Sequence, residues 1–290
     1  MGFTMDIRNL NKSYANLKAL DSVTIEKIKG VHGLVGENGA GKTTLLRILA
    51  TILEKDSGSI THGELNWENS ESVRRKIGYL PQKFGMYHQL TVREVLEHMA
   101  ILKEISGDIK TEVENAIHLV NLDEKKDTKV GALSGGMIRR LGIAQAILGN
   151  PEIIIVDEPT SGLDPEERLR FRLLLRELGN QRTILFSTHI IDDADSICDR
   201  ITVLHKGHVM MTGTCLDIIE NATGKVWLVI ANEMQTLESV VKQKNVYITE
   251  QKKSQDKYSV RMISDKKPCE GAISATPTLE EGYLFLIHGV

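Results

Sequence analysis

A glycine-rich segment constrains this chain more than any other feature of its sequence. It reads GENGAGKTT and lies between an apolar stretch, Val31–Val35, and a stretch with apolar residues at helical spacing, Lys42–Leu53. This order predicts a strand, a loop and a helix, in which glycines let consecutive backbone N–H groups face one anion. The helix adds its positive dipole end at the same place. The expected phosphate-binding residues are Gly36, Asn38, Gly39, Ala40, Gly41, Lys42, Thr43 and Thr44.

Two adjacent acids indicate which chemistry accompanies this loop. Asp157 and Glu158 follow a continuous apolar run that ends at Val156. Such a run is typical of a strand buried on both faces of a parallel sheet, and α/β sheets bind ligands at the carboxyl ends of their strands. We expect Lys42 to reach the β- and γ-phosphates, with Thr43 and Asp157 on Mg²⁺. Glu158 can then act as a general base on the attacking water.

A second helix start also favours anion binding. Ser134, Gly135 and Gly136 precede a segment with apolar residues that continues through Ile147. A helix N-terminus with little side-chain bulk is an anion site. Because one nucleotide has a single triphosphate tail, this second site is best explained if it serves the nucleotide of another copy. A serine-capped helix with a glycine turn is the alternative interpretation.

The alternation of strand and helix patterns predicts an α/β fold with a mostly parallel sheet and helical insertions. One insertion is helical from Thr91 to Leu122, with polar breaks at residues 106–108. The other elements expected before residue 220 are the strands Thr4–Leu10, Val23–Ile28, Thr183–Ser187, Arg200–His205 and His208–Thr212 and the helix Pro165–Leu178.

The pattern changes near residue 220. The elements expected beyond it are the strand Val226–Ile230, the helix Met234–Val241 and an alternating strand at Tyr258–Met262. We therefore expect two domains, residues 1–219 and a small α+β appendage of residues 220–290.

Composition argues against several classes of protein. The net charge is −3 and aromatic residues are 4% of the chain, which disfavours nucleic-acid partners. The three cysteines, Cys198, Cys215 and Cys269, are far apart in the sequence, as expected for reduced thiols in the cytoplasm. No apolar run approaches the length of a membrane span. If the protein acts at a membrane, another chain must do the spanning.

With these motifs in place, residues 4–215 resemble the ATPase subunit of the ATP-binding cassette (ABC) superfamily. The resemblance implies a phosphate-loop NTPase fold with a mostly parallel sheet, an antiparallel β subdomain and a helical subdomain. The matching residues are Tyr14 for adenine stacking, Gly36–Thr44 for the Walker A loop, Gln82 for the Q-loop, Ser134–Gly136 for the signature, Asp157 and Glu158 for Walker B, Asp164 in the D-loop and His189 for the switch histidine.

The resemblance also implies roles and partners. Gln82 would touch Mg²⁺ and the attacking water, and His189 would contact the γ-phosphate. ATP and Mg²⁺ would be bound, with two ATP molecules between two copies or between this chain and a homologous subunit. Transmembrane permease subunits would receive the movement through residues 83–91 and hold the protein on the inner face of the membrane.

The tail from Ala275 to Tyr283 resembles subunits of bacterial drug, bacteriocin and antibiotic-resistance exporters, which favours export. One departure from the family is Met137, where the signature usually ends in glutamine. Two alternatives stay open at this point: a soluble ABC ATPase that acts on ribosomes or nucleic acid, and a nucleotide-sensing regulator. Retention of Glu158 and His189 favours turnover over sensing.

Overall fold

The computed structural model describes residues 4–232, 245–254 and 257–289. Its contacts divide the chain into two compact units, Met1–Thr212 and Gly213–Val290. The boundary expected from the sequence lies later, between residues 219 and 220. The two boundaries differ because helix α8 (Cys215–Asn221) belongs to the second unit, where it packs on α10 (Leu279–His288). The two helices are so close that a Cβ on Gly282 would lie 2.3 Å from the carbonyl oxygen of Ile218.

The first unit contains two sheets and the helices that cover them. Its strands are β1 (Met5–Tyr14), β2 (Leu17–Ile28), β3 (Val31–Val35), β4 (Ser57–His62), β5 (Leu65–Asn66), β6 (Ile77–Leu80), β7 (Ile153–Asp157), β8 (Thr183–Thr188), β9 (Arg200–His205) and β10 (His208–Gly213). Its helices are α1 (Lys42–Leu49), α2 (Ser70–Arg74), α3 (Val92–Leu102), α4 (Ile109–Leu119), α5 (Gly135–Ile147), α6 (Pro165–Gly179) and α7 (Ile191–Ile197).

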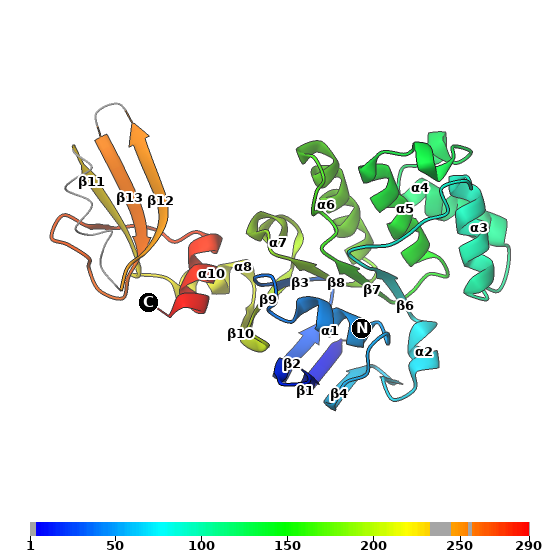
Figure 1. Ribbon diagram of the computed structural model, residues 1–290, viewed down its shortest axis with the longest axis horizontal. Helices are drawn as coiled ribbons and strands as arrows, with labels where there is room; N and C mark the ends of the chain where they lie inside the picture. Colours follow the sequence, from blue (N-terminus) through cyan, green and yellow to red (C-terminus); the bar gives the residue numbers. More distant parts are fainter. Residues whose placement is uncertain (1–3, 233–244, 255–256, 290) are drawn as a thin grey trace. The chain divides into compact units, whose positions relative to one another are not determined.

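The larger sheet has the strand order β10-β9-β3-β8-β7-β6, and the pairs from β9 to β6 are parallel. Figure 1 shows α6 and α7 on one side of it and α1 on the other. Both faces are therefore buried, and the side chains of β7 alternate between two cores. Ile154 and Val156 belong to the core that includes α6, whereas Ile153 and Ile155 belong to the core that includes α1. The continuous apolar run is explained by this double burial.

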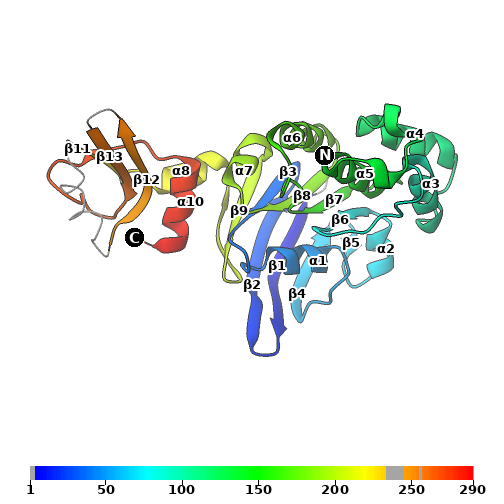
Figure 2. The same cartoon turned by 45° about the horizontal axis from the view of Figure 1, so that its top comes forward.

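The second sheet of this unit is antiparallel, in the order β2-β1-β4-β5. It shares a core with α1, to which Met5, Ile7 and Leu46 contribute. Figure 2 shows the β1–β2 hairpin extending beyond the rest of this sheet. Both strands are longer than the sequence pattern predicts. The pairing between them contains several register shifts. These irregularities break the apolar alternation by which a strand is recognised.

The helices of this unit begin and end at residues whose backbone conformation or capping hydrogen bonds explain the boundary. Helix α1 ends at Leu49 rather than at the expected Leu53, and Thr51 has a left-handed φ of 57°. The expected insertion forms α3 and α4, with the break between them. Thr91 and Glu94 form a reciprocal capping box at the start of α3, and Asp108 caps α4. Pro165 takes the first turn of α6, as expected.

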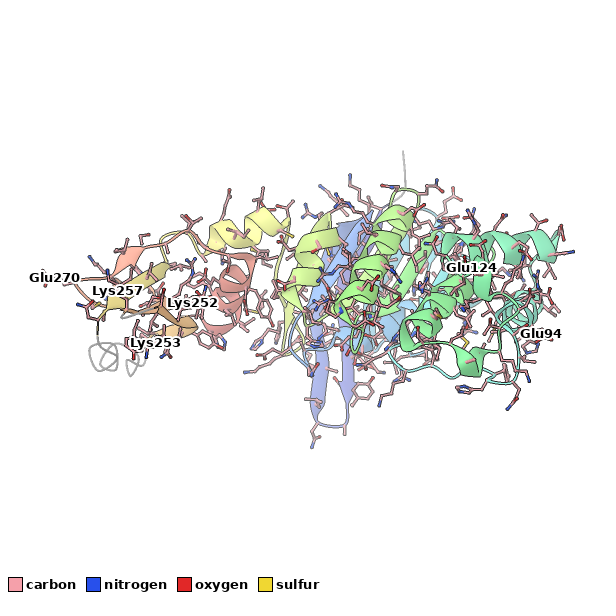
Figure 3. The ribbon with its side chains drawn as sticks, turned by 90° about the horizontal axis from the view of Figure 1, so that it is seen from above. Glu94, Glu124, Lys252, Lys253, Lys257 and Glu270 are labelled. Carbon is pink, nitrogen blue, oxygen red and sulfur yellow. The ribbon has the colours of Figure 1, made fainter. Side chains whose placement is uncertain are left out.

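The second unit is a small α+β domain. Its strands are β11 (Val226–Ala231), β12 (Tyr247–Ser254), β13 (Lys257–Ile263) and β14 (Ile273–Ser274), in the order β12-β13-β11-β14. β12 is an edge strand, and its exposed lysines Lys252 and Lys253 are labelled with Lys257 in Figure 3. Lysines on an edge discourage pairing with another chain. The helix expected at Met234–Val241 lies outside the described residues.

Candidate functional site

The glycine-rich loop connects β3 to α1, as expected, and steric constraints explain two of its glycines. Gly41 has a φ of 104°, and a Cβ there would lie 2.6 Å from the carbonyl oxygen of Ala19. A Cβ on Gly36 would lie 2.3 Å from the carbonyl oxygen of Leu204. Any other residue at these positions would push the loop off β2 and β9. The loop is therefore shaped by its neighbours as well as by its own flexibility.

Lys42 begins α1 and is 5% exposed. Its Nζ donates to the carbonyl oxygens of Gly36 at 2.6 Å and Glu37 at 3.0 Å. The same Nζ lies 3.6 Å from Oε1 of Glu158. Burial lowers the pKa of the Lys42 amine, and the charge of Glu158 opposes that shift. The ammonium is thus held at the loop with a carboxylate beside it.

Asp157 closes β7 and is 1% exposed. Its Oδ1 accepts a hydrogen bond from Ser187 Oγ at 2.6 Å and a longer one from Thr43 Oγ1 at 3.3 Å. Its Oδ2 is buried and has no hydrogen-bond partner among the described residues. A buried carboxylate oxygen left free beside a threonine hydroxyl is the donor set that a Mg²⁺ ion prefers. The residues present therefore fit the expected metal.

Glu158 is the point where the expected catalytic residues meet. Its Oε2 accepts a hydrogen bond from Gln82 Nε2 at 3.1 Å and lies 3.3 Å from His189 Nδ1. With Lys42 on its other oxygen, this carboxylate is engaged on both sides. The residue is 8% exposed and has a φ of 45°, a conformation that is uncommon for a residue with a side chain. Strained backbone of this kind concentrates at functional sites.

A cleft of about 760 Å³ joins these residues, and we call it the Lys42 cleft. Of the expected site residues it is lined by Tyr14, Asn38, Gly39, Gly41, Lys42, Thr43, Thr44, Gln82, Glu158 and His189. Ser161, which the family resemblance places in the D-loop, also lines it, together with residues that were not expected: Leu17, Lys18, Ala19, Lys206 and Gly207. Most of these come from the β1–β2 hairpin and the β9–β10 turn, and only tertiary structure brings those turns to the loop.

Ser187 contacts both acids of the site, although it was not among the expected site residues. Ser187 Oγ donates to Asp157 and accepts from the backbone N–H of Glu158 at 3.0 Å, so one hydroxyl orients both acids. Ser187 stands two residues before His189 on the strand next to β7. A polar residue at the end of a buried apolar strand is the signal that could have identified it.

Other expected residues lie outside the Lys42 cleft. Ser134 caps α5, where its Oγ accepts from the backbone N–H of Met137 at 3.2 Å. Gly135 is exposed, and a Cβ there would meet nothing within 4 Å. Asp164 caps α6 through the N–H of Glu167 at 2.9 Å. Within one chain, the second helix start thus lies outside the first phosphate site.

Gly136 is buried, and packing explains why it is a glycine. A Cβ there would lie 2.3 Å from Oε2 of Glu167, on α6. The same Glu167 oxygen is 3.5 Å from Nε of Arg140, on α5. The start of α5 is therefore packed directly against the start of α6, with Glu167 between them.

Comparisons with known proteins agree with this geometry. The family model described as ABC transporter matches residues 21–161. The Nod factor export ATP-binding protein I of Burkholderia orbicola (strain AU 1054) is 35% identical over 76% of this chain and 74% of its own length. This chain belongs to the ABC transporter family. The bacitracin transport ATP-binding protein BcrA of Bacillus licheniformis is 36% identical over 70% of this chain and 67% of its own length.

A solved ABC structure extends the match beyond sequence. It is a dimeric ATP-binding cassette in a post-hydrolysis state with ADP and Pi, 27% identical, with a TM-score of 0.64 over 72% of this chain and 98% of that chain. The chain is thus the ATP-binding, ATP-hydrolysing subunit of an ABC transporter, and its fold is the expected phosphate-loop NTPase. The transporter assignment is favoured over the ribosomal, nucleic-acid and sensing alternatives. Among the described residues, no helix has the length and apolar character needed to cross a membrane.

Proposed function

We propose that one ATP lies in the Lys42 cleft and is hydrolysed by a water that Glu158 deprotonates. The observation that carries this proposal is the convergence on the Glu158 carboxylate of Gln82 at 3.1 Å, His189 at 3.3 Å and Lys42 at 3.6 Å. Phosphoryl transfer depends on positioning and charge neutralisation more than on covalent chemistry. Three polar groups around a nearly buried carboxylate supply both.

Each remaining residue has a task in this proposal. Tyr14, at the end of β1 and lining the cleft, stacks on the adenine, and the N–H groups of the loop hold the phosphates. Lys42 neutralises the β- and γ-phosphates, and His189 donates to the γ-phosphate. Thr43, Gln82 and Asp157 would hold Mg²⁺, and the ion would neutralise phosphate charge.

Replacing Glu158 with glutamine tests the role of the base. Glu158→Gln keeps the size of the side chain but removes the proton acceptor, so kcat should fall by about 10²–10⁴-fold while ATP still binds. The matched control is Glu166→Gln, which changes an exposed acid on α6 and should leave kcat unchanged. Steady-state ATPase assays and ATP-dependent dimerisation provide the measurements. Near-normal turnover by Glu158→Gln would remove Glu158 from the base role.

The second anion site supports a shared active centre. Ser134 and Gly135 are exposed and lie outside the Lys42 cleft of their own chain. We propose that they complete the site of a second copy, or of a homologous subunit, so that two ATP molecules lie between two head-to-tail chains. ATP then acts as part of the interface, and loss of the γ-phosphate weakens it.

The relatives bear on the process that hydrolysis drives. One is named for Nod factor export and another for bacitracin transport. We propose that this chain powers export through separate permease subunits on the inner face of the membrane, with residues 83–91 as the coupling segment. Residues 1–219 would form the ATPase domain and residues 220–290 an accessory domain. Copurification from membranes tests this: a stoichiometric polytopic partner supports it, and recovery with ribosomes contradicts it.

A further inference from the structure

A buried carboxylate away from the Lys42 cleft connects three segments of the ATPase unit. Asp193 lies on α7 and is 0% exposed. Its Oδ2 accepts from Thr160 Oγ1 at 2.5 Å, and its Oδ1 accepts from Arg168 Nε at 2.7 Å and Arg172 Nε at 2.6 Å. Both arginines belong to α6. Since the carboxylate has partners on both oxygens, it is fully used in holding these segments together.

The segments that Asp193 joins carry the proposed catalytic groups. Thr160 stands two residues after Glu158, in the turn that leads from β7 to α6. α7 begins two residues after His189, at the end of β8. The backbone N–H of Asp193 also donates to the carbonyl oxygen of Ile190 at 3.1 Å. A displacement at Asp193 would therefore reach Glu158 through one turn and His189 through the other.

Buried ion pairs of this kind contribute more to the relative placement of the segments they join than to the stability of the fold. Replacing a buried ion pair with apolar residues is often neutral for stability, because removing charges from water offsets much of their attraction. α6 and α7 also contribute apolar residues to a common core, such as Phe171, Leu175 and Ile197. The arrangement does specify how the Glu158 turn, α6 and α7 are placed.

We propose that Asp193 is a positioning residue that holds Glu158 and His189 in register through Thr160 and α7. The inference rests on the roles proposed above for Glu158 and His189. Asp193 does not line the Lys42 cleft, in which the nucleotide is proposed to lie. Its effect should therefore appear in the rate of the chemical step rather than in the affinity for ATP.

The mildest test changes Thr160, because this leaves both arginine pairs of Asp193 intact. Thr160→Val keeps the shape of the side chain and removes its bond to Asp193, whereas Thr160→Ser keeps the hydroxyl. A misplacement of about 1 Å can lower a rate by about 10²-fold, so kcat of Thr160→Val should fall by about tenfold or more. KM for ATP should change by less than about twofold, and Thr160→Ser should retain most of the activity.

Thr202→Val serves as the matched control for stability. Thr202 is also 0% exposed, and its hydroxyl is hydrogen-bonded to His32 Nε2 and Thr212 Oγ1, both at 2.8 Å. It does not line the Lys42 cleft. This variant should lose a similar amount of thermal stability to Thr160→Val while its kcat stays unchanged.

Four outcomes overturn the inference: an unchanged kcat in Thr160→Val, a rise in KM that accounts for the loss, an equal loss of kcat in Thr202→Val, and a Thr160→Ser variant as impaired as Thr160→Val. All assays use the full chain, with Glu158→Gln measured in parallel. If Glu158→Gln is inactive while Thr160→Val is normal, only the positioning role fails. If Glu158→Gln turns over normally, the assigned base fails first.

Discussion

The hydroxyl of Ser187 shows how much one small side chain decides in this site. It is buried, donates to the carboxylate of Asp157 and accepts from the backbone N–H of Glu158. It therefore orients both the proposed metal ligand and the proposed base. A residue that orients a metal ligand is expected to influence metal affinity although it does not touch the metal.

Ser187→Ala tests this at the scale of one residue. The substitution leaves a buried carboxylate oxygen and a buried N–H with one partner fewer, so the free energy of unfolding should fall by about 1–3 kcal/mol. The apparent Mg²⁺ concentration required for ATPase activity should rise by about 10–100-fold. Urea unfolding and Mg²⁺ titration of the activity measure the two effects. Thr183→Val, at the far end of β8, is the control: an equal change in its Mg²⁺ requirement would contradict a local role for Ser187.

At the scale of elements, the important relation is the packing of α5 on α6. Each helix follows a residue of a family motif, Ser134 of the signature and Asp164 of the D-loop, and in this structure both residues are N-caps. Glu167 lies between the helices, against Gly136 and near Arg140. One helix start cannot move far without displacing the other, so the signature segment and the D-loop segment of one chain are mechanically linked.

Gly136→Ala should disturb this packing. The new Cβ would overlap the Glu167 side chain along its length, which should lower the free energy of unfolding by about 1–3 kcal/mol. The double variant Gly136→Ala/Glu167→Ala should recover much of that loss, because the clash is gone. Gly135→Ala is the control: its Cβ points into open space, and alanine is favoured over glycine in a helix by about 1 kcal/mol. Thermal unfolding compares all three, and a destabilised Gly135→Ala with a normal Gly136→Ala would contradict the packing argument.

At the scale of the whole molecule, the central proposal is that each active centre needs two chains. A mixed assembly tests it. A Ser134→Arg chain lacks the second anion site, and a Lys42→Ala chain lacks the first. Each should be nearly inactive alone. Mixed together, they should form one intact centre from the wild-type Lys42 of one chain and the wild-type Ser134 of the other.

The expected result is about half of the wild-type ATPase activity per mixed dimer, if the two centres act independently. Steady-state assays on a purified mixed dimer, carrying different affinity tags, provide the measurement. The control is a dimer in which one chain carries both substitutions and the other carries neither. No intact centre remains in it under the shared-site arrangement. If each chain instead owned a complete site, the unsubstituted chain would supply about half of the wild-type activity, and that result would contradict the proposal.

The motifs and the fold class follow from local sequence because each rests on neighbouring residues. The loop from Gly36 to Thr44 is contiguous, and the buried strand before Asp157 is marked by an unbroken apolar run. The resemblance to ABC ATPases, now confirmed, rests on the same short motifs. The lengths of β1 and β2 were underestimated, because register shifts interrupt the alternation that marks a strand. The domain boundary depends on the packing of α8 on α10, which no local pattern records.

The sequence by itself determined which residues could carry the chemistry: a phosphate loop, two acids, a glutamine and a histidine. Only the tertiary structure decided their geometry. It brought Gln82, Glu158 and His189 together from three different strand ends, placed Ser187 under both acids, and left Ser134 outside the cleft of its own chain. The physical reason is that residue type and spacing encode local conformation, whereas distances across a sheet depend on how the strands pair and which helices pack against them.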